Sequence, residues 1–515
     1  MQLGALITRA LGLIVEPSPA HQLEIVDVCH DSRRVAPGNL FVAVPGVQHD
    51  GADYIPGAIA AGAVAVVLDE KASLPVMDGG ALRTPSGSPV ALIRTRDVRR
   101  ALARLASVFH GLDTLQAEGS YPAVGITGTN GKSTTAYLLR GILRAAGCRA
   151  AMLGTVEYDL VGRRVVSDLT TPDPVVLARY LMEARSYGAD GFVMEASSHS
   201  LDQCRTDGIR FDVGVFTNLT RDHLNYHGNM ERYLLAKRRL FDLLDERAAA
   251  VVNVDDPAGE RMVEHCPARV IRYAIDQPAD FRAVSLREDR HGTRFVLQHE
   301  GAALEMSTPL VGRHNVYNCL AAAGAARAMG IELSVIRRGL AEVDRVPGRM
   351  QRVPTGELGF DVFVDYAHTD DALRNVLRAA RPLTKGRLWC VFGCGGERDR
   401  PKRPLMARAV AELADRFIIT SDNPRREDPL AIIAEIERGL RPEETSRRET
   451  IPDRRQAIIR AIRQLVPGDT LIIAGKGHED YQEIGTTKIH FDDVETAQAA
   501  VQSREAKVHA AADVA

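Results

Sequence analysis

The segment from Ala123 to Leu139 constrains the fold of this chain more than any other stretch. Its first part, Ala123–Thr127, is a short apolar run that predicts a buried parallel strand. Apolar spacing from Thr135 to Leu143 predicts a helix that follows a tight turn. A strand that leads through a turn into a helix is typical of an α/β protein, and we expect that fold class here.

The turn itself has the composition of a phosphate-binding loop, Gly128-Thr129-Asn130-Gly131-Lys132-Ser133-Thr134. Glycines let backbone N–H groups point at an anion, beside the partial positive charge of a helix N-terminus. A lysine can reach terminal phosphates, and a serine hydroxyl can ligate Mg²⁺. The strict pattern requires glycine where this chain has Ile126, and Gly125 stands one place early. A turn without a ligand is the alternative, but the flanking strand and helix favour nucleoside triphosphate binding.

The length of 515 residues exceeds what one hydrophobic core supports and suggests about three domains. Lys and Arg number 65 and Asp and Glu number 67, so the charge balance gives no case for nucleic acid or an anionic membrane. Seven scattered cysteines are typical of reduced thiols. No apolar run approaches the roughly 18 residues of a membrane span, and the N-terminus lacks signal-peptide features. We expect a cytoplasmic protein.

Alternating strand and helix patterns divide the chain into domains. We expect an N-terminal α/β substrate domain, a central domain, a C-terminal Rossmann-like domain and a frayed tail, over residues 1–115, 122–345, 346–500 and 501–515. The polar stretch Gly111–Tyr121 is predicted to link the first two domains. Around the phosphate loop, the alternation predicts a doubly wound, mostly parallel sheet, with antiparallel strands from Phe281 to Pro309 on one edge.

Ligands of α/β sheets bind at the carboxyl ends of the strands, and Glu195 and His223 are predicted there. Glu195 ends the strand Gly191–Glu195, where a carboxylate is a natural Mg²⁺ ligand beside triphosphate oxygens. A carboxylate satisfied by neighbouring hydroxyls is the alternative. His223 follows the strand Val213–Asn218, and histidine is a poor first choice for Mg²⁺. A metal role and a structural role for His223 therefore both stay open.

Lys237 lies on the apolar face of a predicted helix, Tyr233–Leu244. Its neighbours at helical spacing are Tyr233, Leu240, Phe241 and Leu244. One interpretation is a buried stem with the ammonium group in water. The other is a fully buried lysine whose lowered pKa leaves a neutral, reactive amine.

Polar clusters also end four predicted strands of the C-terminal domain and define one rim: Asp365-Tyr366-Ala367-His368, Gly393–Asp399, Asp422-Asn423-Pro424-Arg425 and Gly475-Lys476-Gly477-His478-Glu479. Arg398 and Arg425 are suited to a bidentate contact with a carboxylate, which makes a small acidic substrate plausible. Two further polar stretches, His30–Arg33 and Val47–Gly51, follow strands of the N-terminal domain, where turn formation and ligand binding both stay open.

Several motifs together resemble those of the Mur ligases, the ATP-dependent amide-forming enzymes of peptidoglycan synthesis. The resemblance covers about residues 20 to 500, and its motifs are Gly-Thr-Asn-Gly-Lys-Ser (128–133), Glu-Ala-Ser-Ser-His-Ser (195–200), Asn-Leu-Thr-Arg-Asp-His-Leu (218–224), Gly-Arg-His-Asn-Val-Tyr-Asn (312–318), Asp-Tyr-Ala-His-Thr (365–369) and Gly-Lys-Gly-His-Glu (475–479). The run Asp422–Arg425 is similar to the motif by which one member of the family selects meso-diaminopimelate.

The resemblance implies a role for each matching position. For the UDP part of a UDP-muramoyl-dipeptide substrate it implies Ser32, Val47, Gln48 and His49. For the muramoyl dipeptide it implies Thr170, Thr171, Ser197, Gln203 and Arg205. For ATP it implies the loop Gly128–Thr134 with Asn315 and Asn318. For diaminopimelate it implies Arg398, Asp422, Asn423, Pro424, Arg425, Gly475 and Glu479. Ser133, Glu195 and His223 are expected around Mg²⁺, and Lys132, Glu195, His223 and Lys237 are the expected catalytic residues.

Lys237 is expected, again from the resemblance, to be carbamylated by CO₂, which gives an anion that helps to place a second Mg²⁺. The implied reaction activates a carboxylate as an acyl phosphate, which an amine then attacks. Since an acyl phosphate must be kept from water, we expect the third domain to close over the second, in a protein that acts as a monomer. A ligase that adds lysine is one alternative, although lysine lacks the distal carboxylate that Arg425 would bind. A nucleotide-dependent regulator that forms no bond is the other.

Overall fold

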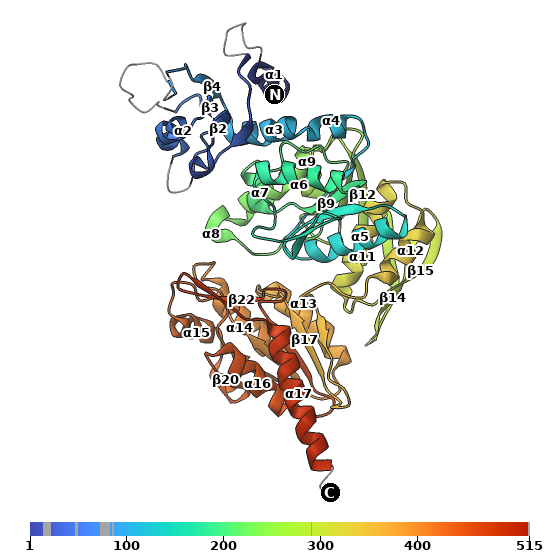
Figure 1. Ribbon diagram of the computed structural model, residues 1–515. Coiled ribbons are helices and arrows are strands. Elements are labelled where there is room, and N and C mark those ends of the chain that lie inside the picture. The colour runs from blue at the N-terminus through green and yellow to red at the C-terminus, as the bar shows by residue number, and fades with distance from the viewer. Residues whose placement is uncertain (14–21, 47–49, 73–82, 85–86, 290, 513–515) are drawn as a thin grey trace.

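The computed structural model describes residues 1–13, 22–46, 50–72, 83–84, 87–289 and 291–512, and the domains follow one another from the N-terminus to the C-terminus along the molecule (Figure 1). Within these ranges, no helix has both the length and the apolar character needed to cross a membrane. The predicted α/β architecture, with a large, mostly parallel central sheet, is confirmed.

The N-terminal domain is a parallel sheet in the order β1-β2-β3-β4, with α1 and α3 packed on one face and α2 on the other. Its elements are α1 (Leu3–Leu11), β1 (Asp27–Cys29), η2 (Ser32–Arg34), β2 (Asn39–Val42), η3 (Gly51–Tyr54), α2 (Ile55–Ala60), β3 (Ala65–Asp69), β4 (Ala91–Thr95) and α3 (Val98–His110). An ion pair of 3.0 Å between Arg100 Nε and Asp207 Oδ2 joins α3 to the central domain.

The stretch predicted to be a linker, residues 111–121, instead contains a helix, α4 (Leu112–Ala117). Leu112 and Gln116 are one helical turn apart and both buried. The Gln116 side chain donates to the Arg210 carbonyl at 2.8 Å and accepts from the Arg210 N–H at 3.0 Å. A buried glutamine that pairs with backbone groups behaves as part of the core, which the polar composition of this stretch concealed.

The central sheet runs in the order β15-β14-β13-β12-β11-β10-β5-β9-β6-β7-β8, and the pairs from β13 to β6 are parallel. Its elements are β5 (Ala123–Thr127), α5 (Lys132–Ala145), β6 (Ala150–Leu153), β7 (Glu157–Asp159), β8 (Arg164–Val166), α6 (Pro174–Ser186), β9 (Gly191–Glu195), α7 (Ser198–Asp202), β10 (Val213–Phe216), α8 (Leu224–His227), α9 (Met230–Asp242), β11 (Ala249–Asn253), α10 (Gly259–Met262), β12 (Arg269–Ala274), β13 (Phe281–Asp289), β14 (Gly292–His299), β15 (Ala302–Thr308), α11 (Arg313–Ala328) and α12 (Leu333–Glu342).

Helices cover both faces of this sheet, as a doubly wound arrangement requires. Buried side chains of α5, α11 and α12 pack on one face, and those of α6 and α9 pack on the other. The predicted antiparallel edge is present as β13, β14 and β15, whereas the antiparallel strands β7 and β8 on the opposite edge were not foreseen. Gly125 in β5 allows close packing, because a Cβ there would lie 2.8 Å from Leu240 and 2.9 Å from Phe211.

The C-terminal sheet runs β16-β17-β21-β18-β19-β20, and only the β16–β17 pair among these is antiparallel. The elements of the domain are β16 (Gln351–Val353), β17 (Asp361–Asp365), α13 (Asp370–Ala380), η4 (Arg381–Leu383), β18 (Leu388–Phe392), α14 (Lys402–Leu413), β19 (Arg416–Ile419), α15 (Pro429–Glu437), η5 (Pro442–Arg447), β20 (Arg448–Thr450), α16 (Arg454–Gln464), β21 (Thr470–Ala474), β22 (Tyr481–Ile484), β23 (Thr487–His490) and α17 (Asp493–Ala512).

The tail predicted to be frayed from residue 501 is helical as far as Ala512 in α17. Ala497 and Val501, one turn apart, are buried in the same apolar cluster as α16. The Arg504 guanidinium donates to the carbonyls of Ile462, in the last turn of α16, and of Leu465, the residue after it. Docking on α16 therefore extends the helix beyond the point that composition alone suggested.

Candidate active site

The phosphate loop joins β5 to α5, and two of its glycines are required by their surroundings. Gly128 has φ +144° and Gly131 has φ +88°. A Cβ at Gly128 would lie 1.8 Å from Thr217 Oγ1, and one at Gly131 would lie 2.3 Å from Asn318 Oδ1. Gly131 precedes α5 and supplies no side-chain cap, so the first N–H groups of this helix are left for a ligand.

Residues after β10 hold the loop in place. The N–H of Thr129 donates to the Asn218 carbonyl at 2.8 Å, and the N–H of Asn130 donates to Asn218 Oδ1 at 2.9 Å. The Thr217 hydroxyl donates to the Asn130 carbonyl at 2.6 Å. Two backbone N–H groups of the loop are thus already hydrogen-bonded within the protein. The N–H groups at the start of α5 are the ones available to bind an anion.

Two lysine side chains converge on one carbonyl of the loop. Lys132 Nζ donates to Gly128 O at 2.9 Å, and Lys237 Nζ donates to the same oxygen at 2.7 Å. Lys237 is 1 % exposed, and its ammonium lies 4.4 Å from the centre of the Tyr233 ring. Burial, followed by the charge of Lys132, lowers the pKa of Lys237 well below its usual range. The ammonium group of Lys237 is therefore buried together with its stem and does not reach water.

Glu195 and Ser133 meet at the carboxyl end of β9. Glu195 is buried, and its Oε1 accepts from Ser133 Oγ at 2.8 Å and from the Thr155 N–H at 2.9 Å. A carboxylate beside a hydroxyl, next to the phosphate loop, fits Mg²⁺, which takes one or two protein oxygens and completes its shell with water and phosphate. The alternative interpretation of Glu195 also holds, because the hydroxyl groups of Ser133 and Thr155 donate hydrogen bonds to its carboxylate.

His223 lies on the same side of the loop, in a left-handed conformation with φ +54°. Burial is the main cause that lowers its pKa to about 3, despite Asp222 Oδ2 at 3.3 Å from its Nε2. Its imidazole is therefore neutral at physiological pH, which is the form that can bind a metal.

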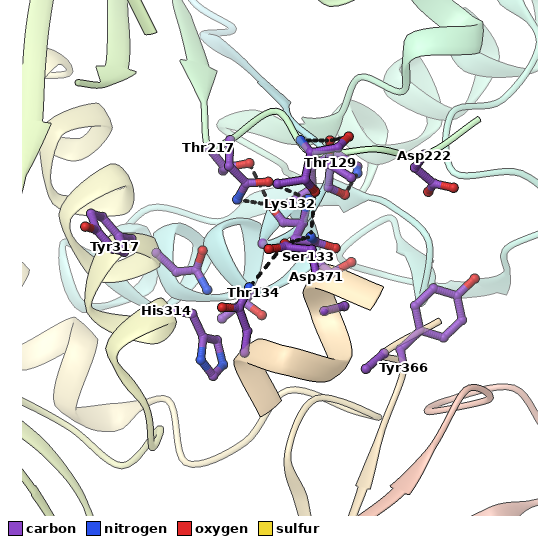
Figure 2. A pocket seen from close by; sticks show the side chains of 18 of the residues that line it. Thr129, Lys132, Ser133, Thr134, Thr217, Asp222, His314, Tyr317, Tyr366 and Asp371 are labelled. Atoms are coloured by element: carbon purple, nitrogen blue, oxygen red, sulfur yellow. Dashed lines mark hydrogen bonds between the residues drawn. The ribbon is translucent and has the colours of Figure 1, made fainter. Parts of the chain in front are cut away.

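These groups line a cavity of about 740 Å³ between the central and C-terminal domains. In Figure 2, side chains of the phosphate loop face Tyr366 and Asp371 of the C-terminal domain, with His314 and Tyr317 of α11 to one side. The predicted nucleotide residues Asn315 and Asn318 lie on α11 and also line this cavity. The structure thus brings the loop from Thr129 to Thr134 together with Glu195, His223, Lys237, Asn315 and Asn318.

The C-terminal domain touches the phosphate loop directly. Asn130 Nδ2 donates to Asp371 Oδ2 at 2.9 Å, and Arg349 Nη2 donates to Ser133 Oγ at 3.1 Å. Arg349 lies in residues 343–350, where the chain crosses from α12 to β16, and its guanidinium is 4.5 Å from the centre of the Tyr366 ring.

A second set of contacts joins the domains around the His223 loop. Asp222 is 5 % exposed and lies 3.7 Å from His368 Nε2 and 3.9 Å from Lys402 Nζ, both in the C-terminal domain. Arg221 Nη2 is 3.7 Å from Asp399 Oδ1, next to Arg398 of the predicted rim. The rim is therefore held against the loop that carries His223.

The residues predicted for the dipeptide form a connected group beside Glu195. Thr171 Oγ1 donates to the Glu195 carbonyl at 2.7 Å, and Thr170 lines the cavity with Ser197. Arg205 Nη1 donates to the Thr171 carbonyl at 3.0 Å, and its Nη2 donates to Gln203 Oε1 at 2.7 Å. Ser32 begins η2 in the N-terminal domain. Val47, Gln48 and His49 lie outside the residues that the structure describes.

The predicted rim of the C-terminal domain is divided by the cavity: Asp365–His368 lines it, whereas Gly393–Asp399, Asp422–Arg425 and Gly475–Glu479 lie outside its lining. Asn423 Nδ2 donates to Glu479 Oε2 at 2.9 Å, and Lys476 Nζ donates to Asn423 Oδ1 at 3.0 Å. Arg425 has φ +53°, and its Nη1 donates to the Gly396 carbonyl at 2.8 Å while its Nε lies 3.1 Å from Glu483 Oε2. Asp422, Asn423 and Pro424 are buried, whereas Arg398 is exposed.

Several site residues escaped the sequence analysis: Thr155, Thr217, Asp222, Tyr233, His314, Tyr317, Arg349 and Asp371. Arg349 follows the turn Val346-Pro347-Gly348, and nothing in its local pattern points toward a ligand. Asp222, His314 and Tyr317 had a usable signal, because they lie within the motifs at 218–224 and 312–318.

Three family models match the chain. They are described as Mur ligase middle domain over residues 126–326, Mur ligase, glutamate ligase domain over residues 348–477, and Mur ligase family, catalytic domain over residues 24–110. Together they span all three regions identified in the fold.

Relatives of known name match nearly the whole chain. The UDP-N-acetylmuramoyl-L-alanyl-D-glutamate–2,6-diaminopimelate ligase of Geobacter metallireducens is 43 % identical over 96 % of this chain and 98 % of its own. The ligase of the same name from Synechococcus elongatus is 43 % identical over 98 % of this chain and 100 % of its own. A solved structure of a ligase with this name is 33 % identical, with a TM-score of 0.66, over 98 % of this chain and 100 % of that one. A MurF ligase from Thermotoga maritima in complex with ADP, 18 % identical with a TM-score of 0.61 over 94 % of this chain and 99 % of that one, shares the fold.

Arg349→Met should weaken the binding of a non-hydrolysable ATP analogue by about 10- to 100-fold. The guanidinium beside Ser133 faces the place where phosphate would lie, and a hydrogen bond to a charged group contributes about 1.5–3 kcal/mol. Isothermal titration calorimetry gives the Kd. Arg352→Met is the control, because that side chain pairs with Asp361 at 2.6 Å and does not line the cavity. An unchanged Kd in Arg349→Met would contradict this assignment.

Proposed function

The chain belongs to the Mur ligase family, and from that membership we propose that it joins meso-2,6-diaminopimelate to UDP-N-acetylmuramoyl-L-alanyl-D-glutamate in peptidoglycan precursor synthesis. It is an ATP-dependent ligase that forms an amide bond. The proposal rests on near-full-length identity to ligases of that name, together with one structural observation. The observation is that the phosphate loop and the rim around Arg425 lie on separate domains that are in contact through Arg221 and Asp399.

The proposed reaction has two steps. The γ-carboxylate of the D-glutamate residue attacks the γ-phosphate of ATP in line, which forms an acyl phosphate and releases ADP. An amine of diaminopimelate then attacks the acyl carbon, loses a proton, and expels phosphate through a tetrahedral intermediate. Lys132, with Nζ at the phosphate loop, neutralises charge that develops on the transferred phosphoryl group. The contacts of the C-terminal domain with the loop limit the access of water to the acyl phosphate.

We assign ATP to the loop Gly128–Thr134 with Asn315 and Asn318, and the muramoyl dipeptide to Thr170, Thr171, Ser197, Gln203 and Arg205. Ser133, Glu195 and His223 would hold Mg²⁺, which supplies charge neutralisation to phosphate oxygens when it is bound. Ser32 is assigned to the UDP part, in the N-terminal domain.

Lys237 is proposed to carry a carbamate. Its burial and lowered pKa favour the neutral amine, which can form an N–C bond to CO₂ with loss of one proton. The resulting anion would offset the positive charge of Lys132, which shares the Gly128 carbonyl with Lys237.

The acceptor amino acid is assigned to Arg398, Asp422, Asn423, Pro424, Arg425, Gly475 and Glu479. The Arg425 side chain is 15 % exposed and is oriented by Gly396 and Glu483, which leaves guanidinium N–H groups for a carboxylate. Glu479 and Asp422 supply carboxylates for an ammonium group on the same rim.

We further propose that the enzyme acts as a monomer in the cytoplasm. The cysteines are free, which is consistent with a reducing compartment: Cys29, Cys148, Cys204, Cys266, Cys319, Cys390 and Cys394.

Phosphate release provides the test of the proposed reaction. With ATP present, we expect phosphate only when UDP-N-acetylmuramoyl-L-alanyl-D-glutamate and diaminopimelate are both added, because each step needs its own substrate. A coupled phosphate assay with every combination of the three substrates measures this. Phosphate release that depends on neither the UDP-dipeptide nor diaminopimelate would instead indicate a nucleotide-dependent regulator.

Lys237→Ala should abolish ligation, and added bicarbonate should not restore it. The wild-type enzyme should lose activity in CO₂-free buffer and regain it with bicarbonate, since the carbamate forms reversibly. Initial rates of phosphate release in degassed and bicarbonate-supplemented buffer give the comparison. Full activity in Lys237→Ala would remove the carbamate from the mechanism.

Arg425→Ala should lower the preference for diaminopimelate over lysine, as a ratio of kcat/KM values, by about 10- to 100-fold. Loss of a charge-assisted contact to the distal carboxylate costs about 1.5–3 kcal/mol, and lysine makes no such contact. Arg426→Ala is the matched control, because that side chain is adjacent and exposed. If Arg425→Ala keeps the full preference, selectivity lies elsewhere.

A further inference from the structure

A fully buried ion pair lies beneath the rim of the C-terminal domain. Arg454, the first residue of α16, and Asp493, the first residue of α17, both have 0 % side-chain exposure. Arg454 Nε donates to Asp493 Oδ1 at 2.8 Å, and Arg454 Nη2 donates to Asp493 Oδ2 at 2.6 Å. The contact is therefore bidentate, and it joins the starts of two helices that pack on the same face of the sheet.

Arg454 also contacts the ends of two strands. Its Nη2 donates to the carbonyl of Ala474, the last residue of β21, at 2.9 Å, and its Nη1 donates to the carbonyl of Ser421, just after β19, at 3.5 Å. These strands are not neighbours, because β18 lies between them in the sheet. One guanidinium thus connects two strand ends that backbone pairing does not connect.

Each of these carbonyls directly precedes a residue assigned to the acceptor amino acid. Gly475 follows Ala474, and Asp422 follows Ser421. Gly475 has φ +119°, and a Cβ there would lie 2.5 Å from Asp422 Oδ2 and 3.8 Å from Arg454 Nη2. Gly475, Asp422 and the guanidinium are therefore in close contact at the floor of the rim.

The charge of Arg454 acts on Asp422 as well. Burial opposes ionisation of Asp422, but the charges of Lys476 and Arg454 outweigh it and keep the pKa of this carboxyl below its usual value. His368 adds a smaller effect in the same direction, whereas Asp422 in turn raises the pKa of its neighbour Glu479.

Stability alone is a weak reason for a chain to keep such a pair. Desolvation of two ions costs about as much as their attraction returns, and apolar replacements of similar volume are often neutral or stabilising. Breaking the pair by removing one partner is different, because it leaves a buried charge uncompensated.

We propose that Arg454 and Asp493 are a positioning pair for the acceptor amino acid, which fixes Gly475 and Asp422 relative to each other from below. This inference rests on the function proposed above. Arg454 supplies the hydrogen bonds to both strand ends, and Asp493 fixes the plane of its guanidinium. The C-terminal helix α17 is thereby part of the support of the acceptor site, although it contributes no residue to the rim.

The double variant R454M/D493L tests the pair without leaving a buried charge. We expect a folded protein whose KM for diaminopimelate rises at least about 10-fold, because a shift of about 1 Å in binding groups can cost up to about 100-fold. The KM values for ATP and for the UDP-dipeptide should stay within about 2-fold, since their assigned residues lie on other elements. Steady-state kinetics with each substrate varied in turn, and thermal unfolding of the same samples, give both readouts.

The matched control is R408M/E444Q. It alters an ion pair of the same domain, in which Glu444 is 2 % exposed and belongs to η5, before β20 and so away from the carboxyl ends of the strands. This control should change the unfolding temperature without changing the KM for diaminopimelate.

R454K is the second variant, because it keeps the cation but cannot make the bidentate contact. It should also raise the KM for diaminopimelate selectively. A wild-type KM for diaminopimelate in either folded variant overturns the proposal, and so does an equal rise in all three KM values. Failure of the proposed function itself would appear differently, as wild-type phosphate release that does not require diaminopimelate.

Discussion

The arrangement of the active site follows from two lysines that share one backbone carbonyl. Lys132 and Lys237 both donate to Gly128 O, and within the described part of the chain neither ammonium has a carboxylate at ion-pair distance. Charging both amines in this confined place is costly, because two cations there would repel each other and burial lowers the pKa of each. The cost is offset when negative charge enters, which is what a triphosphate brings. The Thr217 hydroxyl donates to the Asn130 carbonyl and Asn218 Oδ1 accepts from the Asn130 N–H, and these bonds keep the loop in this shape before any ligand arrives.

The rim proposed to bind the acceptor amino acid lies on another domain, so the proposed reaction depends on how the two domains meet. Asn130 contacts Asp371 on one side of the loop, and Arg221 contacts Asp399 on the other. These contacts bring the rim around Arg425 toward the phosphate loop without making the two sites one cavity. In the proposed reaction, the acceptor amine reacts only after the carboxylate has been activated.

The periodicity of the sequence predicted the strands and helices around the phosphate loop well, because buried parallel strands such as β5 and β11 are continuous apolar runs. The short β7 and β8, with mixed burial, have no such run, and α4 was missed because Gln116 is polar in sequence but buried in the fold. Glu195 and His223 were found because they lie in motifs at strand ends, and Lys237 was found because it lies on the apolar face of a helix. Arg349 could not be found in this way. Its role depends on a contact with Ser133, 216 positions away, that only the packing of two domains creates.

Arg349 also lies where the chain crosses from α12 to β16, and this position links two equilibria. The guanidinium contacts Ser133 of the central domain and stacks near Tyr366 of the C-terminal domain, so a change in the relative orientation of the two domains would alter its contact with Ser133. Any ligand that binds better with Arg349 in place therefore favours the docked orientation, and by thermodynamic reciprocity the docked orientation binds that ligand better. No relay of side chains is needed between such a ligand and the domain arrangement, because Arg349 contacts Ser133 of the phosphate loop and lies in the segment that joins the two domains.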